Sequence, residues 1–258
     1  MRTAKKALRK NSSGQLLIIA ALAIAVLISS TTMYVFDLSK NNTGGAYDQP
    51  INTFIMSLKL SARNAVISSL ANISNGGERT VLEANLNSLS RLLSNLHQSG
   101  LSSMSFTAPN DSSYVSGTRL SWDTSGSGLS SAYANFTLAI YGLTEQVSTE
   151  YVINVTTTLA VNGSYKELVG DQKLVNLTID LFNEGEHALA RNMTLYYENL
   201  GTWTLVDSSN SLSIVDEGNG TYDLSFSVDV FSSSVNVSAN VHDLRGVFVQ
   251  ANTTCLAT

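Results

Sequence analysis

The chain has 258 residues, which is enough for an anchoring segment and one or two compact domains. Apolar residues make up 43 % of it, so a buried core is expected and general disorder is not. All 20 acidic residues follow residue 36, together with ten of the 15 basic ones, so that segment carries a net charge of −10. A body this acidic argues against nucleic acid as a partner.

The first 36 residues combine a basic arm with a long apolar run. Residues 1–15 contain five bases and no acid, and we expect this arm to be cytoplasmic. Residues 16–36 contain no charge, proline or glycine, and as a helix they are long enough to span a bilayer core. The pattern predicts a single-pass membrane protein with its N-terminus inside and its C-terminal body outside. A cleaved secretory signal peptide and a buried core helix are the alternatives.

Ser13-Gly14-Gln15, placed between the basic arm and the apolar run, resembles the class III signal peptide of archaeal type IV pilins and pilin-like proteins. The resemblance implies that a dedicated peptidase cuts between Gly14 and Gln15 and leaves the apolar helix on the mature chain. It also implies a homo-oligomer assembled through residues 16–36. Ser13 stands where this family usually has a basic residue, and Ile19 stands where bacterial pilins have Glu.

Two amphipathic segments follow the apolar run. Residues 37–49 form a polar linker with two adjacent glycines as a flexible joint. Residues 50–100 carry apolar residues at four-and-three spacing in two stretches, separated by Asn75-Gly76-Gly77, which predicts a helical hairpin. The leucine row within residues 82–96 predicts packing inside the chain. A seam between copies in a homo-oligomer is the alternative.

Beyond residue 100 the helical period gives way to a strand-and-turn pattern. Short β-branched and aromatic runs alternate with Gly, Ser, Asn and Asp, and Asp243-Leu244-Arg245-Gly246 is expected to be a hairpin turn. Residues 101–160 are therefore expected to form a β region, and residues 161–258 an immunoglobulin-like sandwich. The predicted fold class is α+β: one transmembrane helix, a helical hairpin and a mainly antiparallel β ectodomain.

The N-glycosylation sequon Asn-x-Ser/Thr occurs twelve times, whereas the composition predicts about five by chance. Asn11 lies on the expected inner side of the membrane. The other eleven asparagines are candidate glycosylation sites: Asn41, Asn72, Asn110, Asn135, Asn154, Asn162, Asn176, Asn192, Asn219, Asn236 and Asn252. Strands rich in Asn and Thr would also raise the count without any sugar being attached, and that alternative stays open.

The sequence contains no nucleophile elbow, phosphate loop or dinucleotide-binding glycine run, so we expect no catalytic residues and no cofactor. The three histidines, His97, His187 and His242, are isolated, which predicts surface or partly buried polar residues and no metal site. The acidic pairs Asp216-Glu217 and Glu184-x-Glu186 are expected to be solvated turns, with weak calcium binding as the alternative.

A few aromatic residues and the one cysteine leave alternatives open. For Trp203, Tyr196, Tyr197 and Tyr222 we expect core or cross-strand packing, and a sugar-binding face is the alternative. For Cys255 we expect no redox role, and an intermolecular disulfide or a lipid site is the alternative.

These features together predict a non-enzymatic surface protein with a structural or adhesive role, pilin-like at its N-terminus. Its partners would be the membrane, other copies of itself, and an envelope glycan or protein. The alternative is a monomeric, anchored binding or sensor module for envelope glycans or a partner ectodomain.

Overall fold

The computed structural model of the protein describes residues 48–96, 102–123, 125–141 and 146–258. The chain divides into two compact units between Leu58 and Lys59. In the described residues, the first unit contributes only the beginning of one helix. The architecture and all contacts given below belong to the second unit, residues 59–258.

Two α-helices occur in the described residues, α2 (Asp48–Ser74) and α3 (Val81–Leu96). α2 is followed by Gly76 in the left-handed region, with φ 91°, whose N–H donates to the Ile73 carbonyl at 3.1 Å. A glycine at this place closes the helix because its missing Cβ removes the steric penalty of positive φ. In α3 the residues of the leucine row at positions 82, 86 and 93 are buried, so this row packs inside the chain.

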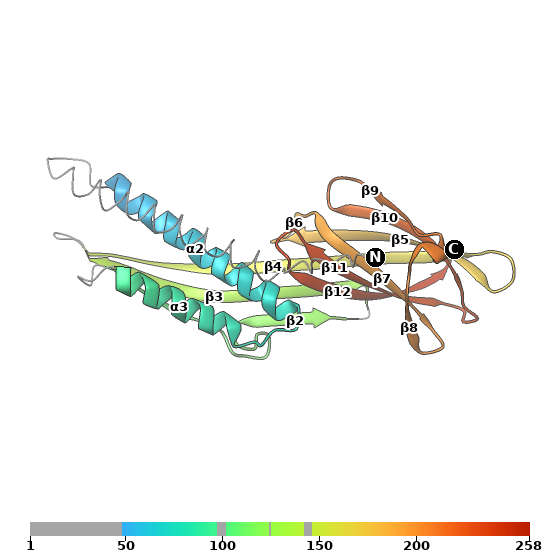
Figure 1. Ribbon diagram of the computed structural model, residues 1–258, viewed down its shortest axis with the longest axis horizontal. Coiled ribbons are helices and arrows are strands. Elements are labelled where there is room, and N and C mark those ends of the chain that lie inside the picture. Colours follow the sequence, from blue (N-terminus) through green and yellow to red (C-terminus); the bar gives the residue numbers. More distant parts are fainter. Residues whose placement is uncertain (1–47, 97–101, 124, 142–145) are drawn as a thin grey trace, which may run out of the picture. The chain divides into compact units, whose positions relative to one another are not determined.

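Twelve strands follow within the described residues: β1 (Ser102–Thr107), β2 (Thr118–Trp122), β3 (Ser127–Tyr141), β4 (Gln146–Glu167), β5 (Gln172–Asn183), β6 (Glu186–His187), β7 (Ala190–Asn199), β8 (Thr202–Leu205), β9 (Ser213–Asp216), β10 (Thr221–Asp229), β11 (Val235–Asp243) and β12 (Phe248–Ala257). Their hydrogen-bonded order is β8-β7-β11-β12-β4-β5-β10-β9, and β3 pairs with β1, β2 and β4 (Figure 1).

β3 and β4 are long, at 15 and 22 residues, and run antiparallel along their full paired length. Because side chains alternate between the two faces of a strand, one face of this pair is buried and the other points outward. The buried face carries Phe136, Leu138, Ile153 and Val155. On this side α3 packs on β1, where the Ser90 hydroxyl donates to the Met104 carbonyl.

The main core lies between the inner faces of β4, β5 and β10 and those of β7, β11 and β12. It is built from buried aliphatic and aromatic residues that include Leu159, Val161, Val175, Leu177, Ile179, Leu224, Phe226, Leu195, Val237, Ala239, Val249 and Ala251. β12 closes the arrangement because its last residues pair in parallel with β4, Leu256 beside Ser164 and Ala257 beside Tyr165.

The predicted fold class, α+β with a transmembrane helix and a mainly antiparallel β region, is wrong. The described residues are mostly strand, and the large sheet is mixed because β12 runs parallel to β4. Within the described ranges, no helix is long and apolar enough to cross a membrane. The predicted single-pass membrane location is therefore not supported, and the segment 16–36 on which it rested lies outside the described residues.

Strands β3 and β4 are longer than the sequence pattern predicts, for a physical reason. Ser, Thr, Asn and Gly interrupt the apolar runs of β3 and β4, and such residues usually indicate turns. In the structure they lie within continuous strands, some on the outward face and others, such as Ser130, Ser131 and Thr157, buried, so the expected boundary between residues 160 and 161 lies inside β4. The missing side chain of Gly128 lets β3 approach β12 closely, since a Cβ there would lie 2.1 Å from the Gln250 carbonyl oxygen.

Candidate functional site

Ten of the eleven candidate glycosylation asparagines lie in the described residues, and none of these ten is buried. The exposed ones are Asn72, Asn110, Asn135, Asn154, Asn162, Asn192 and Asn219. The half-buried ones are Asn176, Asn236 and Asn252. Asn41 and the candidate processing residues Gly14 and Gln15 lie outside the described residues.

Two sequons on β4 and β5 pair with each other across the strands. Asn162 lies opposite Thr178, while Ser164 lies opposite Asn176, so each asparagine faces the hydroxyl residue of the other sequon. Opposed polar pairs of this kind stabilise antiparallel strands by a few tenths of a kcal/mol up to about 1 kcal/mol. Part of the excess of sequons therefore has a structural cause that is independent of sugars.

The same reciprocal arrangement recurs on β11 and β12. Asn236 lies opposite Thr254, and Ser238 lies opposite Asn252. The Thr254 hydroxyl donates to Asn236 Oδ1 at 2.7 Å, and Asn236 Nδ2 donates to a carboxylate oxygen of Glu198 at 2.7 Å. Glycosylation uses Nδ2, so these bonds disfavour a sugar on Asn236.

A shallow hollow of about 610 Å³ lies on the outward face of β4, β5, β10 and the edge strand β9. Seven of the eleven residues that line it carry amide, hydroxyl or carboxylate groups: Asn162, Ser164, Asn176, Thr178, Ser213, Asp223 and Ser225. The Thr178 hydroxyl donates to Asp223 Oδ1 at 2.7 Å, which fixes that carboxylate. Val215, on β9, adds an exposed apolar edge.

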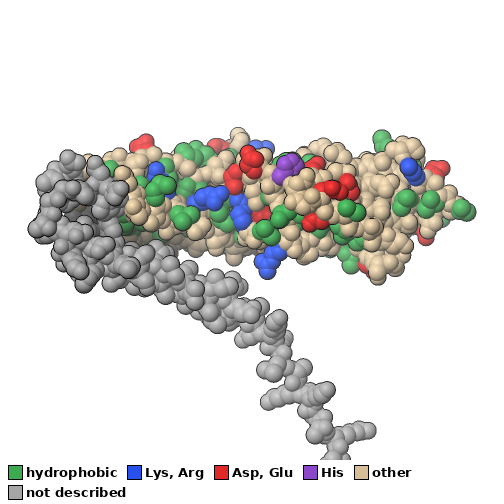
Figure 2. All heavy atoms as spheres, turned by 90° about the horizontal axis from the view of Figure 1, so that it is seen from above, with side chains coloured by type: hydrophobic (Ala, Val, Ile, Leu, Met, Phe, Trp, Pro, Cys, Tyr) green, Lys and Arg blue, Asp and Glu red, His purple; other side chains and the backbone are tan. Residues whose placement is uncertain are grey.

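Three chain connections meet at one end of the sandwich, which we call the loop end: residues 168–171, 200–201 and 230–234. Strand register brings them together, because Gln172 pairs with Asp229 and β7 ends beside the beginning of β11. The most exposed apolar side chain of each connection is Val169 at 92 %, Leu200 at 89 % and Phe231 at 79 %, and Leu168 beside Val169 is 45 % exposed. Figure 1 places the turn between β4 and β5 at the end of the molecule near the C-terminus, and Figure 2 shows hydrophobic side chains at that end.

The connection that carries Phe231 is held by buried side chains. The Tyr165 hydroxyl donates to the Ser233 carbonyl at 2.8 Å, and the Lys173 ammonium donates to the Ser232 carbonyl. Lys173 is only 5 % exposed, and its Nζ lies 4.7 Å from the Tyr165 ring centroid. The backbone beneath Phe231 is thus fixed while its ring remains in solvent.

Leu200 occupies a conformation that disfavours leucine. It has φ 51° and precedes Gly201 with φ 81°, in the tight turn between β7 and β8. A left-handed conformation costs a bulky residue about 1–2 kcal/mol, and Asn, Asp or Gly is preferred in such turns. Because Leu200 is exposed, no burial compensates for this cost.

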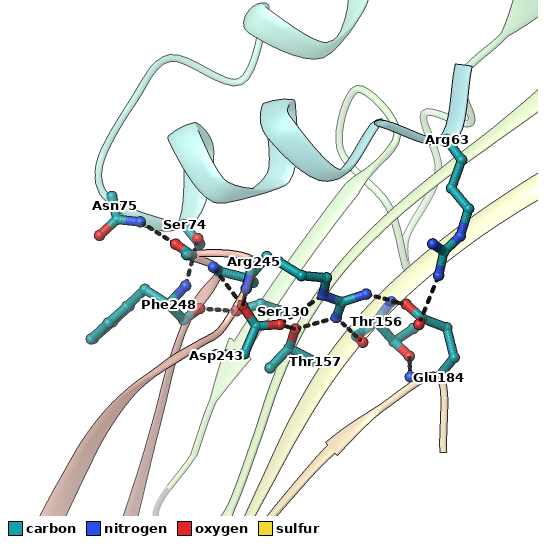
Figure 3. Close-up of polar contacts among 12 residues, drawn as sticks. Arg63, Ser74, Asn75, Ser130, Thr156, Thr157, Glu184, Asp243, Arg245 and Phe248 are labelled. Carbon is teal, nitrogen blue, oxygen red and sulfur yellow. Dashed lines mark hydrogen bonds and ion pairs between the residues drawn. The ribbon is translucent and has the colours of Figure 1, made fainter. Parts of the chain in front are cut away.

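The opposite end of the sandwich, which we call the turn end, consists of the turns between β11 and β12 and between β5 and β6. Asp243 is fully buried there and accepts backbone N–H groups from Arg245 and Val247, both at 2.9 Å. It also accepts the Thr157 hydroxyl at 3.1 Å and Arg245 Nε at 2.8 Å (Figure 3). Four hydrogen bonds stabilise this buried carboxylate.

Arg245 extends the network to two other elements. Its guanidinium donates to the Thr156 carbonyl and the Thr157 hydroxyl, each at 2.9 Å, and to Glu184 at 2.7 Å. Glu184 also pairs with Arg63 of α2 at 3.1 Å (Figure 3). Because these donors and acceptors satisfy one another, the cluster fastens elements together and presents no reactive group.

The turn end is also fastened to the C-terminus of α2. The Phe248 N–H donates to the Ser74 hydroxyl at 2.9 Å, and Asn75 Nδ2 donates to the Gly246 carbonyl at 3.0 Å. His242 Nε2 lies 2.8 Å from Asn75 Oδ1. Among the described residues no group of three or more His, Cys, Asp or Glu is placed to hold a metal ion.

The structure places several residues for which the sequence allows two interpretations. Cys255 is buried, and burial raises the pKa of its thiol to about 12, so it stays protonated and shielded in the folded chain. Tyr222 is buried in the core, whereas Trp203 on the edge strand β8 is 45 % exposed. Glu184 takes part in the turn-end network, and Asp216 Oδ1 accepts the Gly218 N–H at 2.8 Å in the turn before β10.

The loop end was missed by the reasoning from sequence. Val169 and Leu200 each stand directly before a turn glycine, Gly170 and Gly201, whereas Phe231 precedes a run of serines. A large apolar residue directly before a turn glycine is the signal that would have identified two of the three connections. No family model matches the chain, and no curated protein is significantly similar to it.

Proposed function

We propose that this protein has a structural or adhesive role and that it holds its partner through the loop end. The observation that carries the proposal is the exposure of three large apolar side chains, Val169, Leu200 and Phe231, on three separate connections at one end of the sandwich. Apolar residues that gather at the surface typically mark interaction sites. Rigidly held aromatic and aliphatic side chains bind well because little conformational entropy is lost on binding.

The charges beside the loop end favour a protein partner over an anionic lipid surface. Glu167, Asp171 and Asp229 are exposed at the ends of the strands that lead into it, against one exposed base, Lys166. An acidic border repels anionic headgroups and attracts Lys and Arg. The partner that fits is therefore a protein with an apolar patch bordered by basic residues.

The pilin-like resemblance of the N-terminal residues also supports a structural role, although those residues lie outside the described part. In this proposal the chain has no catalytic role. The sequons fit an adhesive surface as well, since the outward faces that carry them are rich in hydroxyl and amide groups. Figure 2 shows one face of the molecule, on which charged side chains are scattered among side chains of other kinds.

Retention of protein-coated beads on intact cells of the source organism tests the proposal. The test variant combines Val169→Ser, Leu200→Asn and Phe231→Ser in the full chain. All three side chains are solvent-exposed, so we expect the fold to persist while bead retention falls at least tenfold. Circular dichroism and the thermal midpoint check the fold.

A matched variant changes three exposed apolar residues elsewhere, Leu92→Ser, Ile214→Ser and Leu244→Ser, which are 59 %, 50 % and 63 % exposed. We expect this variant to change retention less than twofold. Equal retention by the two variants would show that the loop end is not the binding surface. Retention on anionic lipid vesicles that equals retention on cells would show that the partner is not a protein.

A further inference from the structure

Two sequons line the hollow on the outward face of β4, β5, β9 and β10. Asn162 is exposed at its β4 side, and Asn176 is half-buried on the neighbouring strand β5. The register places them diagonally, since Asn162 lies opposite Thr178, two residues beyond Asn176. Diagonal positions on adjacent strands are about 7–8 Å apart. A sugar rooted at either asparagine would cover the other one.

We propose that the hollow is the resting place of an N-linked oligosaccharide carried by Asn162, and that Asn176 on the same molecule stays unmodified. This proposal rests on the sequon and the hollow, and it is independent of the adhesive role of the loop end. Asn162 is the carrier because its side chain is exposed, whereas that of Asn176 is half-buried and opposes Ser164.

The lining of the hollow suits a sugar. Ser164, Thr178 and Ser225 offer hydroxyls, and Asp223 offers a carboxylate fixed by Thr178. These groups donate to and accept from sugar hydroxyls, while Val215 offers an apolar edge for the C–H face of a ring. A sugar held in this way would shield the edge strand β9, whose residues 213–216 are all exposed. Covering an edge strand reduces pairing with other chains.

The modification requires an activated sugar donor, namely a lipid-linked glycosyl phosphate or pyrophosphate, and the transferase that uses it. Asn162 Nδ2 forms a bond to the anomeric carbon, and the bond from that carbon to the phosphate oxygen breaks. The amide loses one proton, and the lipid phosphate leaves with the electron pair. No oxidation or reduction occurs.

Glycopeptide mass spectrometry of the native chain, purified from its own cells, tests the assignment. We expect a sugar on Asn162 and none on Asn176 in any peptide that contains both. The variant Thr178→Ala destroys the sequon of Asn176 and should leave the fraction of Asn162 that carries a sugar unchanged, although it removes one hydroxyl from the lining of the hollow. Ser164→Ala destroys the sequon of Asn162 and should remove the sugar. An unmodified Asn162, or both asparagines modified in one peptide, would overturn the proposal.

Release by an endoglycosidase tests whether the sugar lies in the hollow. We expect release from Asn162 to be at least tenfold slower in the folded chain than in the unfolded chain. Replacing the apolar edge by Val215→Lys should remove most of that protection. Asn154, exposed on the same outward face but outside the hollow, provides the matched comparison wherever it carries a sugar. Equal release from Asn162 in the folded and unfolded chains would show that the hollow does not hold it.

Discussion

The turn end and the loop end are formed by the same strands, but they differ in which side chains are buried and which are exposed. At the turn end the buried polar groups satisfy one another: Asp243 accepts four hydrogen bonds and Arg245 reaches three partners besides it. At the loop end, Tyr165 and Lys173 support the backbone of the connection that carries Phe231, while Val169, Leu200 and Phe231 remain in solvent. A polar cluster whose hydrogen-bonding groups are all paired stabilises the fold. Exposed apolar side chains on a fixed backbone leave a surface that a partner can contact.

Under the proposed function, this difference separates residues that determine stability from residues that determine binding. Substitutions at the turn end are expected to unfold the protein without a specific effect on binding. Substitutions at the tips of the loop end are expected to affect binding and leave stability almost unchanged or improved. The predictions below test that separation.

The largest expected effect comes from Asp243→Ala. Removal of the carboxylate leaves two buried backbone N–H groups, one hydroxyl and part of the Arg245 guanidinium without their acceptor. Breaking a buried charged network in this way costs about 3 kcal/mol of the free energy of unfolding. Urea unfolding measures the loss. Leu244→Ala in the same turn is the control, with an expected change below about 0.5 kcal/mol. Similar midpoints for the two variants would contradict the role of the turn end.

Lys173→Met tests whether the fixed backbone at the loop end matters for binding. The change keeps the aliphatic stem but removes the ammonium that donates to the Ser232 carbonyl. We expect a loss of about 1.5 kcal/mol in stability, typical of a hydrogen bond to a charged group. Bead retention should fall several-fold although every apolar tip is intact. Lys166→Met, on the exposed neighbouring strand end, should change neither quantity. Full retention by Lys173→Met would show that preorganisation is unimportant.

Cys255 lies beside the loop end, and the pKa of its thiol depends on how completely water is excluded there. Burial raises the pKa of the thiol from 9.0 to about 12, so the folded state holds the proton more tightly than the unfolded state. This stabilisation is complete below pH 9 and is lost as pH rises from 9 toward 12, at up to about 1.4 kcal/mol per pH unit.

Stability measured between pH 9 and 10 should therefore fall by about 1 kcal/mol through this thiol. In Cys255→Ala that part of the decrease should disappear. Tyr151, whose pKa burial raises from 10.0 to about 12, adds its own decrease above pH 10 in both proteins. An identical pH dependence in the two proteins between pH 9 and 10 would mean that the thiol is hydrated.

The sequence predicted the local elements better than their assembly. Asp243-Leu244-Arg245-Gly246 was correctly expected to be a hairpin turn, and it joins β11 to β12. The residues that Arg245 binds, Thr157 and Glu184, are 88 and 61 positions away in the chain. Only the register of the assembled strands brings them together, and no local pattern encodes it.

The candidate sites show the same limit. Sequons are visible in any sequence, but their reciprocal pairing on β4 with β5 and on β11 with β12 depends on register. The apolar side chains of the loop end could not be predicted, because the composition of a turn does not show which of its side chains is exposed. The parallel pairing of β12 with β4 involves only two residue pairs, too few to leave a pattern in the sequence.

The smallest expected effect is also the one that separates binding from stability most cleanly. Leu200→Asn places a residue that tolerates the left-handed conformation at φ 51°, and the lost leucine side chain was 89 % exposed. The variant should therefore be about 0.5 kcal/mol more stable than the parent, measured by urea unfolding, while bead retention falls. Leu205→Asn is the control, because Leu205 is 48 % exposed on β8 with ordinary strand geometry, and it should gain no stability. A protein that becomes more stable and less adhesive through one exposed residue would show that this leucine is retained for binding, whereas unchanged retention would remove Leu200 from the binding surface.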